Sequence, residues 1–224
     1  MIRQGSASLE ARVYNELKEA VLCGQYKKGE WLTEHMLTQK LGVSRTPVRS
    51  ALQRLAEDGL VSLTPNRGAV VIGIAKEDIV DIYRIRMRLE GLASAMAAEK
   101  VTEETKQKLS ETVALFEFYA QRQDTERIEE LDTVFHSTIY EASGSRTLQR
   151  ILTDLHSNIK AYRTQSLCIP GRRIKTLEEH KEILNAILTG DAERAESLTS
   201  AHVERAMENM LLVLAGNGDD AVGV

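Results

Sequence analysis

Residues 41–49 read Leu41-Gly42-Val43-Ser44-Arg45-Thr46-Pro47-Val48-Arg49, and this stretch decides the fold of the first third of the chain. Glycine at position 42 permits a tight turn between two helices. Ser44 or Thr46 can cap the second helix by accepting a hydrogen bond from a free backbone N–H of its first turn. Pro47 fits there because first-turn amides need no intrahelical partner. The stretch therefore predicts a helix-turn-helix.

The helix that follows the turn has one apolar face, because Val48, Leu52 and Leu55 fall at i, i+4 and i+7. In helix-turn-helix proteins the start of this second helix meets base edges in the major groove of DNA. Three residues near its start lie outside the apolar stripe and are candidate DNA contacts: Arg45, Thr46 and Arg49.

A two-stranded wing is predicted directly after this helix. Residues 60–63 and 69–72 read as short strands, and residues 64–68 between them have the composition of a turn. Arg67 and Gly68 lie at the tip of this hairpin, where an arginine can approach a narrow minor groove. Upstream, residues 8–22 and 34–41 read as helices, with Thr33 as a cap for the second.

These motifs resemble the DNA-binding domain of the GntR family of bacterial transcription regulators. The resemblance rests on residues 41–49, 51–55, 58–61 and 65–68. It covers nearly all of residues 8–73 and implies a winged helix-turn-helix domain over residues 1–73. Ser50 and His35 depart from the pattern of many relatives, which have an acidic and a basic residue at those two places.

The charge distribution agrees with a DNA-binding first domain. The whole chain has a formal net charge of −4, but residues 1–73 contain ten Lys and Arg against seven Asp and Glu. The remaining residues contain 19 against 26. A basic first third on an acidic body is typical of a DNA reader attached to a regulatory domain.

The rest of the chain has a helical pattern. Residues 73–75 are the expected boundary, and residues 215–224 read as a flexible tail. Residues 76–214 are expected to form an antiparallel bundle, so the predicted fold class is mainly α. The six candidate helices are 76–99, 102–122, 124–143, 146–167, 173–189 and 191–214.

The sequence also predicts where the protein works. No run of 18 apolar residues is present, and the N-terminus lacks the apolar core of a signal peptide, so we expect no membrane association. Cys23 and Cys168 form no metal-binding or redox motif and are expected to be reduced thiols. These features predict a cytoplasmic protein.

One group of residues in the bundle has the chemistry of a metal site. Asp132 and His136 are four residues apart and project from the same helix face. His180 and His202 lie on two later helices. Three histidines and a carboxylate suit zinc, nickel or another borderline divalent ion. Spacing alone leaves open the alternative that each histidine is a buried structural residue.

Residues 76–214 resemble the FCD effector domain of the FadR subfamily within GntR. The residues that carry this resemblance are 132–136, His180, 186–187, 190–191 and His202. The resemblance implies that Asp132, His136, His180 and His202 hold a divalent metal, zinc or nickel.

The resemblance also suggests where an effector binds. Arg86 falls where the family places an arginine facing the effector cavity, which suits a bidentate pair with an organic acid. The alternative is that Arg86 pairs with Glu90, its i+4 neighbour. Arg163, Tyr162 and Asn185 are further candidates for the cavity lining.

The sequence therefore predicts a regulator and not an enzyme. We expect a homodimer that binds double-stranded operator DNA, senses a small carboxylate through a metal ion and represses transcription. Two alternatives remain open, which are a metal-dependent hydrolase and a sensor in which the ion itself is the signal. Against the hydrolase, no H-E-x-x-H run is present.

Overall fold

The computed structural model of the protein describes residues 9–22, 24–65, 67–73 and 76–216. The chain forms two compact units, Met1–Lys76 and Glu77–Val224. Residues 74 and 75 of the expected boundary lie outside the described residues, as do residues 1–8, Cys23 and residues 217–224 of the expected tail.

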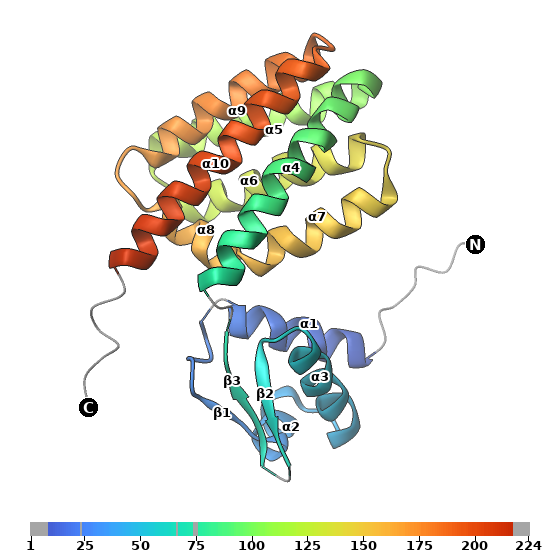
Figure 1. The fold of residues 1–224 in the computed structure, drawn as a ribbon, viewed down its shortest axis with the longest axis vertical. Helices are drawn as coiled ribbons and strands as arrows, with labels where there is room; N and C mark the ends of the chain where they lie inside the picture. The colour runs from blue at the N-terminus through green and yellow to red at the C-terminus, as the bar shows by residue number, and fades with distance from the viewer. Residues whose placement is uncertain (1–8, 23, 66, 74–75, 217–224) are drawn as a thin grey trace. The chain divides into compact units, whose positions relative to one another are not determined.

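The first unit is a winged helix-turn-helix (Figure 1). Its elements in chain order are α1 (Leu9–Leu22), β1 (Trp31–Leu32), α2 (Glu34–Leu41), α3 (Arg45–Glu57), β2 (Val61–Thr64) and β3 (Gly68–Val71). The three strands form an antiparallel sheet in the order β1-β3-β2. The sequence interpretation had placed β2 and β3 within one residue but had missed β1, because two residues are too few to show a strand periodicity.

The turn and caps of the first unit follow the sequence chemistry closely. Gly42 ends α2 in the left-handed conformation at φ 65°. Thr33 caps α2 by accepting a hydrogen bond from the backbone N–H of Met36. Ser44 is the N-cap residue of α3, but its side chain makes no capping hydrogen bond.

The core of the first unit is built from the predicted apolar stripes. The aliphatic side chains of α1, α2, α3 and the sheet meet there without solvent exposure, since Leu17, Leu37, Val48 and Leu55 are all at most 1% exposed. This core fixes α3 on α1 and α2 and leaves the polar start of α3 at the surface. Arg45, Thr46 and Arg49 are accordingly exposed.

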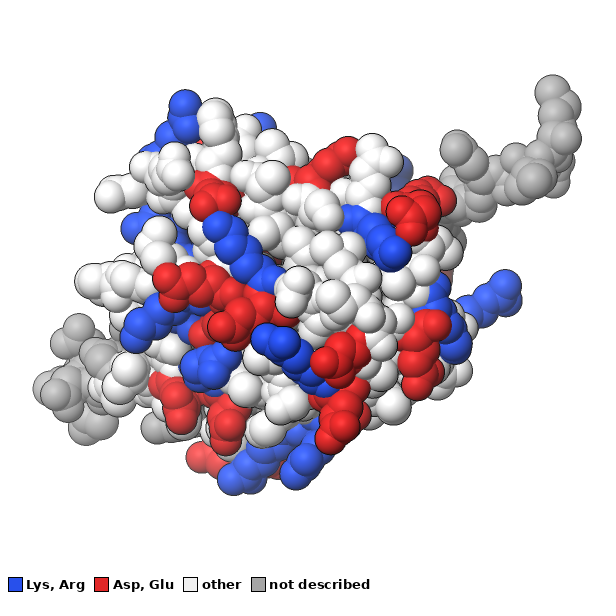
Figure 2. Space-filling view, turned by 90° about the horizontal axis from the view of Figure 1, so that it is seen from above, with Lys and Arg blue, Asp and Glu red and all other residues white. Residues whose placement is uncertain are grey.

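The second unit is all-helical, so the predicted fold class is confirmed. Its helices are α4 (Lys76–Lys100), α5 (Glu103–Arg122), α6 (Thr125–Ala142), α7 (Arg146–Asn158), α8 (Lys160–Leu167), α9 (Arg172–Leu188) and α10 (Ala192–Gly216). Pairs α5–α6 and α9–α10 pack against each other (Figure 1). Acidic and basic side chains are interspersed on the face drawn in Figure 2.

The predicted number of six helices is wrong, because the described part of this unit contains seven. The expected helix 146–167 is interrupted at Ile159, whose backbone leaves the helical conformation at φ −107° and ψ 13°. Neither glycine nor proline marks the break in the sequence, so the usual punctuation signal was absent. Ile159 is fully buried, and the burial of its side chain is a tertiary effect.

Candidate functional site

A hollow of about 750 Å³ lies between α2, α3 and the wing of the first unit. Three of the predicted DNA-contacting side chains line it, namely those of Arg45, Arg49 and Arg67. Gly68 also lines it, and His35 contributes from α2. Thr46 is exposed on α3 beside this hollow but does not line it. The structure thus gathers cations from two separate elements on one surface.

The sequence interpretation missed an acidic partner within this hollow. Glu34, at the first position of α2, accepts two hydrogen bonds from Arg49, at 2.8 Å from Nε and 3.0 Å from Nη2. The hydrogen bond from Arg49 lowers the pKa of Glu34 below its ordinary value. Fork-to-fork pairing of this kind holds the guanidinium in one orientation. Glu34 is therefore a positioning residue for Arg49.

Gly68 is required by the backbone of the wing. Its φ of 104° lies in the left-handed region, and a Cβ added there would overlap the carbonyl oxygen of Leu32 and lie 3.0 Å from Cα of Thr33. Gly68 pairs with Thr64 across the hairpin. Only glycine allows this close approach of β3 to the segment of β1.

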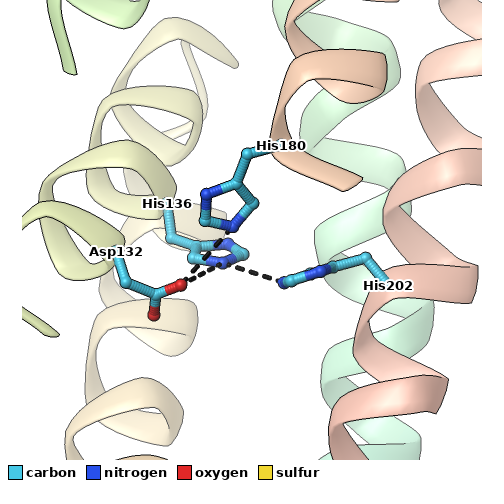
Figure 3. Close-up of side chains that lie close together, drawn as sticks. All are labelled: Asp132, His136, His180 and His202. Carbon is cyan, nitrogen blue, oxygen red and sulfur yellow. Dashed lines mark hydrogen bonds and ion pairs between the residues drawn. The ribbon is translucent and has the colours of Figure 1, made fainter. Parts of the chain in front are cut away.

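The second unit brings Asp132, His136, His180 and His202 together (Figure 3). One ligand atom from each residue lies within 4.8 Å of the other three. The Nε2 atoms of His136 and His202 are 3.3 Å apart, and Oδ1 of Asp132 lies 3.8 Å from Nε2 of His136 and 3.4 Å from Nε2 of His180. All four residues are at most 5% exposed.

Two glutamates lie beside the imidazole rings of this cluster. Oε2 of Glu90 lies 2.9 Å from Nδ1 of His136, and Oε2 of Glu179 lies 2.6 Å from Nδ1 of His202. Each carboxylate favours the tautomer with a proton on Nδ1, which leaves the Nε2 lone pair for a metal. The sequence interpretation gave Glu179 no role, and considered Glu90 only as a partner of Arg86.

The donor set fits a divalent transition metal. For donors about 2.1 Å from a common centre, tetrahedral neighbours are about 3.4 Å apart, close to the separations between the donor atoms here. Both ring nitrogens of His180 are buried and have no hydrogen-bond partner among the described residues. Burial lowers the pKa values of His180 and His202, so both rings favour the neutral form that a metal needs.

The aspartate of the cluster is held ionised by a neighbouring arginine. Arg163 on α8 donates to Oδ2 of Asp132. Burial alone would raise the pKa of Asp132, but the charge of Arg163, together with the neighbouring histidines, outweighs burial and holds the pKa well below its ordinary value. Asp132 is therefore available as an anionic ligand.

A small cavity of about 30 Å³ opens beside Asp132, His136 and His202. Arg86 and Arg163 line it, and each has one guanidinium nitrogen, Nη1, that is buried and has no hydrogen-bond partner in the described part of the chain. Nε of Arg86 donates to Glu90 at 2.6 Å, so the ion pair considered from the sequence is present, and Arg86 also faces the cavity. These two arginines therefore offer buried donors beside the cluster of Asp132, His136, His180 and His202.

The two remaining effector candidates have different outcomes. Asn185 is exposed and is not among the residues that line this cavity. It follows His180 by five residues on α9, a separation that turns it roughly 140° away around the helix. The side chain of Tyr162 lies outside the described residues.

Comparisons with known proteins agree with this two-part architecture. Residues 9–71 match the bacterial regulatory proteins of the gntR family, and residues 81–205 match the FCD domain. The chain is 30% identical over 205 residues to the uncharacterized HTH-type transcriptional regulator YdhC of Bacillus subtilis (strain 168), a match that covers 90% of each sequence.

Two further relatives cover most of the chain. The gluconate operon transcriptional repressor of Bacillus subtilis (strain 168) is 28% identical over 201 residues, which are 88% of this chain and 82% of the repressor. The solved structure of E. coli McbR/YncC superimposes with a TM-score of 0.76 at 27% identity, and the match covers 95% of this chain and 99% of that one.

The fold and the relatives together place the chain in the class of DNA-binding transcription regulators that have a winged-helix domain followed by a helical domain. The chain belongs to the GntR family of bacterial regulatory proteins and carries an FCD domain. Of the helices in the described part of the chain, none combines the length and apolar character that crossing a membrane requires.

Proposed function

We propose that this regulator is a homodimeric, cytoplasmic repressor whose FCD domain binds a divalent metal, zinc or nickel, and a small carboxylate that modulates operator binding. The observation that carries the sensing part of the proposal is the buried cluster of one aspartate and three histidines. Two of its imidazoles have their Nδ1 atoms beside glutamates, which directs their Nε2 atoms inward.

Operator binding is assigned to the hollow of the first unit. Arg45 and Arg49 at the start of α3 would contact bases or adjacent phosphates in the major groove, and Thr46 a phosphate or base. Arg67 and Gly68 of the wing would approach the minor groove, where the backbone of Gly68 brings the hairpin tip close to the duplex.

The effector is assigned to the cavity beside the metal cluster. A metal bound there supplies a positive charge that attracts a carboxylate oxygen. Arg86 lines the same cavity and would hold the second oxygen through its unpaired Nη1 by a charge-assisted hydrogen bond, with the charge of Arg163 nearby. Because the cavity is about 30 Å³, it has room for only a few atoms, which favours a small acid or the head of a larger one.

The homodimer is supported by symmetry and by one exposed apolar face. A two-fold dimer matches a palindromic operator with half-sites about one helical turn, roughly 34 Å, apart or nearer. Ile85 and Leu92 are seven residues apart on α4 and therefore share a face, and they are 48% and 45% exposed. A second chain that covers this face would bury them.

Native mass spectrometry tests the metal and the dimer together. The wild-type protein should appear as a dimer with one metal per chain. The double variant His180→Ala/His202→Ala should lose the metal, whereas His35→Ala, which removes an exposed histidine from α2, should keep it. Stoichiometric metal in the double variant would show that the ligand set is wrong.

Operator binding is tested separately by fluorescence anisotropy with a labelled operator fragment. Arg49→Ala should weaken binding by about 1–3 kcal/mol. Arg127→Ala, which removes an exposed arginine from α6 in the other unit, should leave binding unchanged. Equal affinities for the two variants would remove Arg49 from the interface.

A further inference from the structure

A second, larger groove lies on the outer side of the helical unit. It has a volume of about 520 Å³ and runs between α6 on one side and α7 and α8 on the other. Carbon atoms make most of its open surface. From α6 it is lined by Thr133, Val134 and Ser137, and from α7 by Thr153 and Ser157. Its size falls within the range of small-molecule sites in proteins.

Three buried polar side chains form the inner wall of this groove. Tyr140, His156 and Arg163 line it and are 2%, 5% and 7% exposed. The hydroxyl of Tyr140 and Nδ1 of His156 are 3.1 Å apart and share a hydrogen bond. Nε2 of His156 and Nη1 of Arg163 are buried without a partner among the described residues. Buried polar atoms are rarely left unpaired, so two at one wall indicate a ligand that pairs with them.

The two acidic side chains that line the groove, those of Glu129 and Glu130, do not pair with these buried atoms. Glu129 accepts a hydrogen bond from Thr164 at 2.7 Å and lies 4.0 Å from Nζ of Lys160. Glu130 pairs with Arg127 at 2.7 Å. Both carboxylates are therefore already engaged, whereas Nη1 of Arg163 is still without a partner among the described residues.

This groove is distinct from the cavity beside the metal cluster. Of the residues that line the two, Arg163 is the one they share. His156 lines the groove but not the cavity, and its ring centroid lies 5.2 Å from that of His136. His156 and Arg163 therefore separate the groove from the cluster of Asp132, His136, His180 and His202.

We propose that the groove between α6, α7 and α8 is a second ligand site, for a small amphipathic monoanion. Its apolar body lies along Val134 and the methyl groups of Thr133 and Thr153. Its anionic group pairs with Nη1 of Arg163 and with His156. This site goes beyond the proposed carboxylate sensor and does not require that a metal be bound.

The shared arginine gives the groove a means of acting on the other site. Arg163 donates to Asp132 of the metal cluster, and the same guanidinium faces the groove. A ligand that draws on Arg163 from the groove changes the environment of Asp132. By linkage, occupancy of the metal cluster then changes affinity in the groove by the same factor.

The probe for this site is anilinonaphthalene sulfonate, which has an apolar aromatic body and one negative charge and fluoresces when it leaves water. Wild-type protein should bind one molecule per chain. Ser137→Trp places an indole in the groove and should weaken binding by about tenfold or more, because the bulk of the indole occupies the space of the probe. Ser137 is exposed, so the variant is expected to fold.

Ser110→Trp is the matched control. Ser110 is also an exposed helical serine that donates to a preceding backbone carbonyl, but it lies on α5 and does not line the groove. The affinity of the Ser110→Trp variant for the probe should equal that of the wild-type protein. Equal affinities in the two tryptophan variants, or the absence of probe binding to wild type, would overturn the groove as a site.

The neutral analogue phenylnaphthylamine tests the class of ligand. It lacks the sulfonate and should bind wild type about tenfold more weakly, because it cannot pair with Arg163. Equal binding of the two probes would overturn the anionic preference. Metal content, measured on the same samples, should be the same in all variants, so a failure of the groove is distinguishable from a failure of the metal proposal.

Discussion

The carboxylate of Glu179 connects the proposed metal ligands to two arginines, and the variant Glu179→Gln removes its charge while keeping its shape. Oε2 lies 2.6 Å from Nδ1 of His202, and the two carboxylate oxygens accept hydrogen bonds from Arg172 at 2.9 and 3.1 Å and from Arg205 at 2.7 Å. Burial raises the pKa of Glu179, but His202 and Arg172 outweigh it and lower the pKa to about 2. The variant therefore removes a full negative charge at neutral pH.

The expected loss of zinc affinity is about 10- to 100-fold, as for other groups that orient a metal-bound histidine. That range corresponds to about 1.4–2.7 kcal/mol. We expect a loss of zinc affinity in the upper half of this range, because the amide N–H₂ of the glutamine would face the N–H donors of Arg172 and Arg205. Arg172 is 4% exposed, and the loss of its charged partner should lower the free energy of unfolding by about 3 kcal/mol. Arg205 is 42% exposed at its side chain, so its share is small.

The assay is a competition titration of metal-free protein against a chromophoric zinc chelator, with thermal unfolding of the same samples. Glu117→Gln is the matched control, since Glu117 pairs with Lys181 at 2.6 Å and both side chains are 45% exposed. Its zinc affinity should equal that of wild type. If Glu179→Gln does not fold, the double variant Arg172→Met/Glu179→Gln removes the unpaired cation and keeps the test of His202.

The result that would refute this reasoning is equal zinc affinity in Glu179→Gln and Glu117→Gln. It would mean that Nδ1 of His202 needs no carboxylate to present its Nε2 lone pair. A loss of zinc affinity with unchanged unfolding would instead support the orienting role and contradict the energetic one.

Three further predictions concern the wing, the DNA-facing hollow and metal removal. Gly68→Ala should lower the free energy of unfolding by at least about 3 kcal/mol in a urea titration, whereas Gly59→Ala, at φ 73° with open space around it, should cost only about 1–2 kcal/mol; equal losses would contradict the close approach of Gly68 to Leu32. Glu34→Gln should lower the ratio of operator affinity to non-specific DNA affinity, because Arg49 loses its fixed orientation and the hollow loses a negative charge. Both affinities are measured by fluorescence anisotropy at several salt concentrations. An unchanged ratio would contradict the positioning role of Glu34. Removal of the metal with a chelator should lower the unfolding temperature of the metal-bound protein. If the free metal had been at 100 times its dissociation constant, the free energy of unfolding should fall by about 2.7 kcal/mol. An unchanged unfolding temperature would argue against a metal that stabilises the fold.

Much of the fold was predictable because the relevant signals are local. Gly42 marks the turn and Thr33 the cap, and both act on their immediate neighbours. Five of the six expected helices of the second unit appear within about two residues of their predicted ends, since caps and apolar periodicity are short-range features. The sixth expected helix is interrupted at Ile159. No glycine or proline marks this break, and the side chain of Ile159 is fully buried among the packed helices.

The candidate site was predictable in its ligand types but not in its supporting contacts. Asp132 and His136 share a helix face by spacing alone, and the resemblance to the FCD domain brought His180 and His202 into the set. The sequence does not show that Asn185 is exposed, because its position depends on the rotation of α9 within the bundle. A pattern of apolar residues shows which face of a helix is buried, but not which polar groups of other helices it meets.

The sequence by itself determined the class of the protein, because turn chemistry, caps and apolar stripes act over a few residues and are written in the order of the chain. Tertiary structure alone decided how those parts work together. It brought the carboxylate of Glu179 to Nδ1 of His202 and the carboxylate of Glu34 to the guanidinium of Arg49. It also placed Arg163 where it lines both the small cavity and the groove. Each of these contacts joins residues from different helices, and the rotation and spacing of packed helices follow from the interlocking of all their side chains at once.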